Sequence, residues 1–308
     1  MRLRQPIIQN IETHTSQQIC RRSNNPYPNV TSLADRALTV YREDGTLVLV
    51  KKALQKLYTN TYCRIISFRG HYSLTLNDET VEFSAPTPTM VKRNRKRFIS
   101  EQEELRAFHD EIEPEDTVYD IGANTGLYSL FAATKCRRGT VAAFEPYPPN
   151  IEVLRQDRDR NALHNIDIVE SALSDTVGEI EFSQPDEDDV GYGSSAIDAT
   201  GDGSSITVPT TTGDKLVADG ELPPPNVVKI DVEGAESLVI EGIKQALTTP
   251  ECRTVFCEVH LPGIDIRPSV EDFGSSLDNI RSKLEAFGFS TRKITTEGES
   301  EVTIMATK

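Results

Sequence analysis

Residues 117–129, Thr117-Val-Tyr-Asp-Ile-Gly-Ala-Asn-Thr-Gly-Leu-Tyr-Ser129, are typical of a short buried strand, a glycine turn and the start of a helix. Gly122 and Gly126 can adopt backbone angles that a Cβ forbids, and they leave room for a ligand beside the main chain. The helix that follows offers free N–H groups at its N-terminus. The stretch therefore predicts either a cradle for a nucleotide-sized ligand or tight packing of strand against helix in an α/β fold.

An acidic residue distinguishes this turn from the dinucleotide fingerprint G-x-G-x-x-G. Asp120 stands two residues before the first glycine, in the spacing Asp120-x-Gly122-x-Asn124-x-Gly126, and the third glycine of the fingerprint is missing. A carboxylate at that place repels a pyrophosphate and suits a cationic or hydroxyl-rich ligand. A nicotinamide-dependent oxidoreductase is therefore disfavoured.

Strands and helices alternate after the turn, which predicts an α/β fold with a mainly parallel sheet and flanking helices. The expected strands are 118–121, 140–145, 166–171, 227–232, 254–260, 289–294 and 301–306, and the expected helices are 127–135, 149–163, one ending at 247, and one over 270–287. Residues 176–213 predict a hairpin and a loop containing Asp186-Glu-Asp-Asp189, either a lid over the site or an acidic surface loop. In such a sheet, ligands bind at the carboxyl ends of the strands.

Glu145 ends the second expected strand, about twenty residues after the glycine turn, where a carboxylate can accept both hydroxyls of a ribose. Together with Asp120, it favours a ribonucleoside without a pyrophosphate. S-adenosylmethionine fits best, because its ammonium and sulfonium would approach a cradle edged by carboxylates. The candidate cofactor-binding residues are Asp120, Gly122, Asn124, Gly126, Glu145, Ser171 and Asp231.

The first hundred residues differ from this pattern. Residues 1–32 are polar and predict a poorly ordered arm. Residues 33–99 predict a helical and hairpin region, with two short helices in 33–58 separated at Asp44-Gly45 and a hairpin in 72–85. The two helices carry basic residues and form either a docking surface for an anionic membrane or acceptor, or a helical cap with a solvated basic face. The remaining domain is 100–308.

Two further motifs lie near the boundary between the N-terminal region and the domain that begins at residue 100. The basic run Met90-Val-Lys-Arg-Asn-Arg-Lys-Arg-Phe98 predicts either a lining of the acceptor entrance or a solvated linker. Ser100-x-x-Glu103 predicts a capping box that opens a helix ending before Pro114.

The formal net charge of −15 is divided unevenly. Residues 1–114 contain 17 Lys and Arg against 13 Asp and Glu, whereas residues 115–308 contain 16 against 35. An acidic surface disfavours nucleic acid as a partner, and it suits a halophilic protein that stays soluble in concentrated salt. No run of 18 apolar residues is present, and the five cysteines form no Cys-x-x-Cys pair. We expect a soluble cytoplasmic protein.

Four motifs together identify a family. Asp120-Ile-Gly-Ala-Asn-Thr-Gly126, Phe144-Glu-Pro146, Lys229-Ile-Asp-Val-Glu-Gly-Ala-Glu236 and Glu258-Val-His260 resemble the FkbM family of S-adenosylmethionine-dependent methyltransferases. The resemblance covers about residues 100–308 and is closest to the haloarchaeal branch. It implies a Rossmann-like class I sheet of order 3-2-1-4-5-7-6 with the last strand antiparallel, and methyl transfer to a hydroxyl oxygen of a sugar or related small molecule.

Transfer to a hydroxyl needs a general base, because an alcohol must lose its proton as the new bond forms. The carboxyl ends of the fourth and fifth strands offer Asp231, Glu233, Glu258 and His260. We expect His260 or Asp231 to be the base, with Glu258 orienting it. The alternatives are that Glu258 and His260 bond each other or the backbone, or that Asp231, Glu258 and His260 hold a divalent metal, for which the sequence gives no ligand spacing.

Three other functions are compared with these motifs below. Transfer to nitrogen is disfavoured because Asp-Val-Glu-Gly stands after the fourth strand, where amine methyltransferases have Asn/Asp-Pro-Pro-Tyr. Carboxyl methylation of a uronic acid needs no strong base and stays open. A non-catalytic scaffold that binds the cofactor is the third possibility. The acceptor and the oligomeric state are not encoded in these motifs.

Overall fold

The computed structural model describes residues 33–183, 205–263, 267–297 and 300–308. The predicted arm at 1–32 and the acidic run at 186–189 lie outside these residues. The chain divides into two compact units: the first comprises residues up to His71 together with Ala85–Ser100, and the second comprises Tyr72–Ser84 and Glu101–Lys308. No described helix is both long enough and apolar enough to cross a bilayer.

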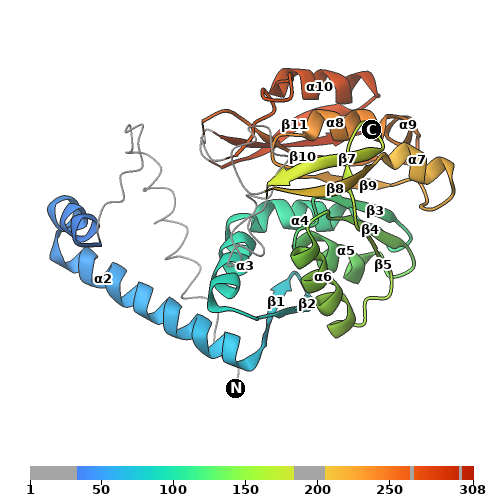
Figure 1. Ribbon diagram of the computed structural model, residues 1–308. Coiled ribbons are helices and arrows are strands. Elements are labelled where there is room, and N and C mark those ends of the chain that lie inside the picture. The colour runs from blue at the N-terminus through green and yellow to red at the C-terminus, as the bar shows by residue number, and fades with distance from the viewer. Residues whose placement is uncertain (1–32, 184–204, 264–266, 298–299) are drawn as a thin grey trace. The chain divides into compact units, whose positions relative to one another are not determined.

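The second unit is built on a seven-stranded sheet, as predicted. Its order is β11-β12-β10-β9-β3-β4-β5, which is 3-2-1-4-5-7-6 when these strands are numbered along the chain (Figure 1). The strands are β3 (Thr117–Ile121), β4 (Thr140–Phe144), β5 (Ile166–Val169), β9 (Val227–Ile230), β10 (Thr254–His260), β11 (Ser290–Glu297) and β12 (Glu301–Thr307). β12 runs antiparallel to both β10 and β11, and the pairs from β10 through β9, β3 and β4 to β5 are parallel.

Helices cover both faces of this sheet, so its central strands are buried throughout. Figure 1 shows α4, α5 and α6 on one side and α8, α9 and α10 on the other. Their bounds are α4 Gln102–Glu111, α5 Leu127–Lys135, α6 Pro148–Arg160, α8 Glu236–Gly242, α9 Lys244–Thr248 and α10 Leu277–Ala286. All residues of β3 and β9 are buried, which is why both strands are mostly apolar without alternation, each with one buried charged residue, Asp120 or Lys229. The predicted α/β class is confirmed.

A smaller sheet follows β5. It consists of β6 (Ala172–Leu173), β7 (Gly178–Ser183) and β8 (Ser205–Thr211), in the order β6-β8-β7. β7 and β8 are antiparallel, as expected of the hairpin in 176–213. A short helix that we did not predict, α7 (Gly213–Ala218), comes next, capped by the Thr212 side chain, which accepts from Lys215 N.

The hairpin near residue 77 is confirmed, and it belongs to the second unit except for its first residue. β1 (His71–Leu76) and β2 (Glu79–Ser84) form a two-stranded sheet. Asn77 has a positive φ of 50°, as a tight turn between two strands requires. Alternate residues of β1 are buried, which matches the sequence pattern.

Two predictions for the N-terminal region are wrong. Residues 33–69 form one helix, α2 (Leu33–Arg69), that continues through Asp44-Gly45. A glycine inside a helix costs only about 1 kcal/mol relative to alanine, so it need not end one. The capping box is also absent, because Ser100 is the last residue of α3 (Pro88–Ser100) and its hydroxyl donates to the carbonyls of Lys96 and Arg97. The basic run 90–98 is therefore helical.

Candidate functional site

The carboxyl ends of β3, β4 and β9 are joined by backbone hydrogen bonds. Gly122 N and Ala123 N both donate to Phe144 O, at 3.0 and 2.9 Å. Asp231 N donates to Ile121 O at 3.0 Å. The loops after these three strands therefore meet at one edge of the sheet, where a doubly wound fold binds its ligand.

Packing explains both glycines of the turn. Gly122 has φ +84°, and a Cβ there would lie 1.9 Å from Asp231 O. Gly126 has φ +89°, and a Cβ there would lie 2.3 Å from Leu154 Cδ1. The sequence predicted either a cradle for a ligand or tight packing at this turn. Close contact with the loop after β9 and with α6 is sufficient to explain why both positions are glycine. Asn124, between them, also has a positive φ, of 54°.

Asp120 and Glu145 are both buried at this edge. Asp120 Oδ2 accepts from Ser129 Oγ at 2.5 Å. Glu145 accepts from Asn124 N at 2.7 Å and from Tyr147 N at 2.9 Å. The Asn150 side chain also bonds this carboxylate. Since a carboxylate has about four lone pairs, these three bonds leave capacity for a ribose hydroxyl.

Burial changes the acidity of Glu145. Loss of hydration raises its pKa to about 7, with the nearby charge of Asp120 acting in the same direction, although the two backbone N–H bonds oppose the shift. The charge of Asp120 thus acts on Glu145, as expected of two carboxylates that lie at the same site. Ser171 is half-buried just beyond β5, and its N–H donates to Val169 O at 2.9 Å.

A second cluster surrounds His260 at the end of β10. The imidazole is buried, and its Nε2 faces carboxylate oxygens of Glu233, Asp231 and Glu258 at 3.5, 3.8 and 3.9 Å. On the other side of the ring, Nδ1 lies 2.6 Å from Glu236 Oε1. Asp231 follows β9, whereas Glu258 and His260 belong to β10, so the ends of these two neighbouring strands bring the three residues together. Asp231 also links this cluster to the glycine turn.

The charge state of His260 follows from these contacts. Burial alone lowers its pKa, but the bond to Glu236 and the charges of Glu236, Glu233 and Asp231 outweigh it and raise the pKa to about 9. In the protein without ligands the imidazole is therefore protonated at neutral pH and is a weak candidate for the base.

Glu233 and Glu258 show the opposite response. Burial raises the pKa of Glu233 to about 7, although His260 opposes this. Burial and the neighbouring Asp231 charge raise the pKa of Glu258 well above its usual range. Glu233 also has a positive φ of 51°, which a non-glycine residue rarely adopts away from a functional or strained position.

We did not predict a role for Lys229 or Glu236 from the sequence. Lys229 is 1% exposed, its Nζ lies 2.9 Å from Asp231 Oδ2, and it sits 4.3 Å from the centre of the Tyr128 ring. A lysine in the interior strand Val227-Val-Lys-Ile230 was the available signal, because a fully buried lysine needs a partner. Glu236, completely buried, accepts from Gly234 N at 2.9 Å and gave no such signal.

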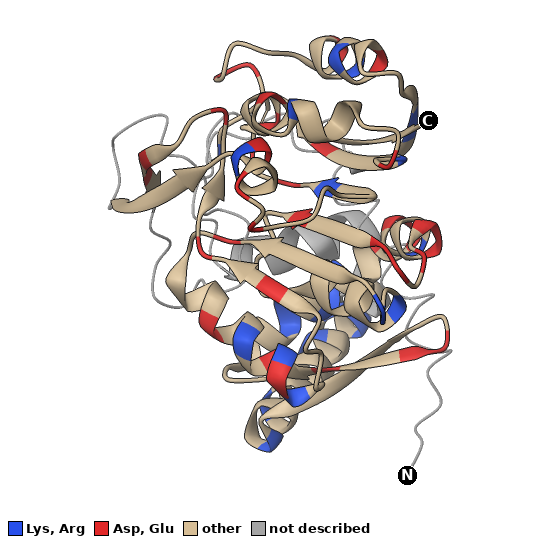
Figure 2. Ribbon diagram, turned by 90° about the vertical axis from the view of Figure 1, so that its right-hand side faces the viewer, with Lys and Arg blue, Asp and Glu red and all other residues tan. Residues whose placement is uncertain are grey.

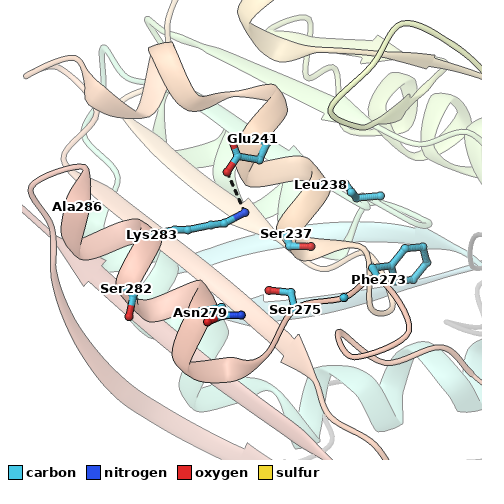
Figure 3. Close-up of a pocket in the computed structure, with 10 residues that line it drawn as sticks. Ser237, Leu238, Glu241, Phe273, Ser275, Asn279, Ser282, Lys283 and Ala286 are labelled. Atoms are coloured by element: carbon cyan, nitrogen blue, oxygen red, sulfur yellow. Dashed lines mark ion pairs between the residues drawn. The ribbon is translucent and has the colours of Figure 1, made fainter.

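Two hollows of the second unit lie elsewhere. One of about 440 Å³ is lined by residues of α8 and α10 and by the loop before α10, with Lys283 2.8 Å from Glu241 (Figure 3). Another of about 620 Å³ lies beside Arg137 and Asn161. Neither hollow includes a predicted site residue.

Comparisons with known proteins agree with the motifs. The family model described as "Methyltransferase FkbM domain" matches residues 120–291. Hexuronic acid methyltransferase AglP of Haloferax volcanii is 35% identical over 165 residues, which is 54% of this chain and 64% of the relative. The chain thus spans a little less than two thirds of that relative's length. The 31-O-demethyl-FK506 methyltransferase FkbM of Streptomyces tacrolimicus is 26% identical over 58% of this chain and 75% of its own.

Similar solved structures include a precorrin-6y C5,15-methyltransferase from Geobacter metallireducens. That structure is 15% identical, with a TM-score of 0.42, over 69% of this chain and 93% of its own. A methyltransferase from Aquifex aeolicus described as SAM-dependent gives 13% identity and a TM-score of 0.40, over 70% of this chain and 97% of its own. Scores this low add nothing to the family assignment, which follows from the sequence matches.

Proposed function

Because the chain belongs to the FkbM methyltransferase family and its cofactor is S-adenosylmethionine, we propose that it transfers a methyl group to an oxygen of a sugar or glycan. The observation that carries the proposal is the adjacency of two acidic groups at one sheet edge. Asp120 and Glu145 suit the cofactor, and the cluster around His260 suits the proton transfer. Asp231 belongs to both.

The residues of the cradle fit the cofactor. Buried carboxylates at the ends of β3 and β4 can accept from an ammonium and from ribose hydroxyls. Asp120, Asn124, Glu145, Ser171 and Asp231 would hold it, with Gly122 and Gly126 shaping the turn. When bound, the cofactor supplies a methyl group on a sulfonium; binding and orientation are the task of these side chains.

We propose that the base comes from the carboxylates rather than from His260. A general base works best when its pKa is near the working pH, and Glu233, with a pKa of about 7, meets that condition. His260, with a pKa of about 9, would instead compensate the charge of the carboxylates around it. Asp231 and Glu258 complete the set of candidates.

A carboxyl group of a hexuronic acid is the second candidate acceptor. The printed name of the Haloferax volcanii relative favours it. The carboxylates around His260 favour a hydroxyl instead, because they repel an anionic acceptor and can accept a proton.

The product distinguishes the two acceptors. The protein would be incubated with labelled S-adenosylmethionine and with glucuronic acid-containing oligosaccharides or their neutral counterparts. A methyl ether survives mild alkali, whereas a methyl ester is hydrolysed. Label that is stable to alkali supports the hydroxyl acceptor, and label released as methanol supports the carboxyl acceptor. Cofactor binding without transfer to any acceptor would favour a non-catalytic scaffold.

We also propose that α2 contacts an anionic membrane surface. Phe68 is 94% exposed, and Val50, Leu54, Leu57, Tyr58 and Ile65 are between 49% and 64% exposed. At 3.6 residues per turn these side chains form one stripe. The same spacing puts Lys51 and Arg69 along one side of the stripe and Arg64 along the other. An apolar stripe between basic residues is the pattern of helices that lie in a membrane interface.

Vesicle flotation tests this contact. Vesicles with about 30% anionic phospholipid should carry the protein, and the double variant Leu57→Glu, Phe68→Glu should lose binding. Val177→Glu, which changes an exposed valine on the second unit, is the matched control and should bind normally. A wild-type protein that stays with the unbound fraction, or that forms dimers lost in the double variant, would contradict the membrane proposal. A cytoplasmic location is part of the same proposal and agrees with the four cysteines of the described residues, which are all free and buried.

A further inference from the structure

The atoms around His260 are arranged like the ligands of a metal ion. One ligand atom each from Asp231, Glu258 and His260 lie within 4.8 Å of one another. We propose that these three residues bind one divalent cation of the Mg²⁺ and Mn²⁺ class. The site is defined by its own geometry; its role in catalysis rests on the proposed function.

The spacing exceeds that of hydrogen bonds and matches coordination. His260 Nε2 lies 3.8 Å from Asp231 Oδ1 and 3.9 Å from Glu258 Oε1. Two ligands that each stand about 2.1 Å from a metal are separated by about 3.0 Å at a right angle and by about 4.2 Å when opposite. Both observed separations fall inside that range, and the third, between Asp231 and Glu258, is at most 4.8 Å, so an inward movement of one carboxylate would let an ion contact all three atoms.

The orientation of His260 points its second nitrogen at the cluster. The side chain is 1% exposed, and Nε2 makes no hydrogen bond within the described part of the chain. Nδ1 is held at 2.6 Å by Glu236, whose carboxylate is itself fixed by Gly234 N. Metal-binding histidines typically have this arrangement, in which a carboxylate accepts from Nδ1 and Nε2 releases its proton and gives its lone pair to the ion.

The charges around the cluster also favour a cation. Asp231, Glu233, Glu236 and Glu258 all approach the imidazole within 4 Å. The facing cations are Lys229, which is 2.9 Å from Asp231, and Arg267, which also pairs with Glu301. Four carboxyl groups, of which Glu236 is fully buried and the other three are 12–15% exposed, outnumber these positive groups, and an ion of charge +2 would stabilise their ionised forms.

The ligand set selects the type of ion. Carboxylate oxygens suit Mg²⁺ and Mn²⁺, and one imidazole among oxygen ligands is compatible with Mn²⁺ in particular. The cluster lies at the ends of β9 and β10, beside the proposed cofactor cradle. A cation there would attract an acceptor oxygen and offset the repulsion between its developing negative charge and Glu233.

Mn²⁺ titration of the full chain tests the site. Protein stripped with EDTA and dialysed would be titrated with Mn²⁺ in about 1 M KCl, without cofactor or acceptor, and free Mn²⁺ followed by electron paramagnetic resonance. High salt suppresses weak binding to the acidic surface. We expect one Mn²⁺ per chain in the wild type, at least tenfold weaker binding in Glu258→Gln and in Asp231→Asn, and unchanged binding in Glu251→Gln, which removes one exposed carboxylate.

The outcomes separate this inference from the proposed function. Circular dichroism would establish that each variant is folded. Wild-type binding no tighter than that of folded Glu258→Gln overturns the metal site. If S-adenosylmethionine still binds in that case, the methyltransferase proposal stands without a metal. Conversely, Mn²⁺ binding at the expected ratio without cofactor binding would support the site and contradict the proposed function.

Discussion

The pKa of Glu145 predicts how the stability of the protein changes with pH. In the folded protein this pKa is about 7, against 4.5 for an ordinary glutamate. The folded state therefore binds a proton more tightly than the unfolded state. The stability contributed by the protonated form is complete below about pH 4.5 and is lost as pH rises through 7. The difference between a pKa of 4.5 and one of about 7 corresponds to about 3 kcal/mol of unfolding free energy.

The variant Glu145→Gln isolates this contribution, because it removes the titrating group and keeps the side-chain size. Its single amide oxygen can replace only one of the bonds to Asn124 N and Tyr147 N. We expect the variant to be less stable than the wild type at pH 4.5, by about 1–3 kcal/mol. By pH 8 the difference should have shifted by about 3 kcal/mol in favour of the variant.

Urea unfolding at several pH values measures the difference. The exposed Glu170, replaced by glutamine, is the control and should follow the wild type at every pH. The buried carboxylates other than Asp120, whose charge acts on Glu145, contribute equally to wild type and variant and cancel. A difference between wild type and Glu145→Gln that stays constant from pH 4.5 to 8 would refute the reasoning.

Three other changes have expected outcomes. Gly122→Ala should destabilise the fold by about 3 kcal/mol or more by urea unfolding, because its Cβ would meet Asp231 O, whereas Gly220→Ala, with a similar φ and open space, should cost about 1 kcal/mol. Lys229→Met should cost about 3–5 kcal/mol, and much less in combination with Asp231→Asn, in a double-mutant cycle. When the KCl concentration is raised from about 0.2 M to about 2 M, the thermal midpoint and the solubility should both increase, because salt screens the net charge of −15. A steady decrease of either quantity would contradict this expectation.

Figure 2 shows that the expected salt dependence concerns the whole second unit. Acidic residues are spread over most of its elements, with basic ones between them. The repulsion is thus distributed over the surface and does not depend on one pair. A single surface substitution should therefore change the salt dependence very little.

The sheet was predictable because its strands carry strong local signals. Short, mostly apolar runs such as Val118-Tyr-Asp-Ile121 and Thr254–His260 end at glycine turns or polar residues. Strands of a parallel sheet that is buried on both faces are recognised by such runs alone, without alternation of apolar and polar residues. The helix α2 was mispredicted at Asp44-Gly45, because a local turn signal does not reveal what a long helix tolerates. Ser100 failed as a cap because α3 had not ended there.

The site was predictable in its residues but not in its chemistry. Asp231, Glu258 and His260 were placed at the carboxyl ends of neighbouring strands, and one ligand atom of each lies within 4.8 Å of the others, whereas their roles stay predictions. The pKa of His260 depends on Glu236, which lies in the helix after β9 and is buried by tertiary packing. Likewise, position 122 has no room for a Cβ because of the carbonyl oxygen of Asp231, which is more than a hundred residues away in the sequence. Sequence patterns do not contain such contacts.

Calorimetric titration with S-adenosylmethionine tests most directly the central claim, that the ends of β3, β4 and β9 form one cofactor site. We expect one molecule bound per chain, binding at least tenfold weaker in Asp120→Asn, and unchanged binding in Glu241→Gln, which alters the hollow of Figure 3. An absence of binding heat together with no thermal shift, or equal affinity in the wild type and Asp120→Asn, would contradict it.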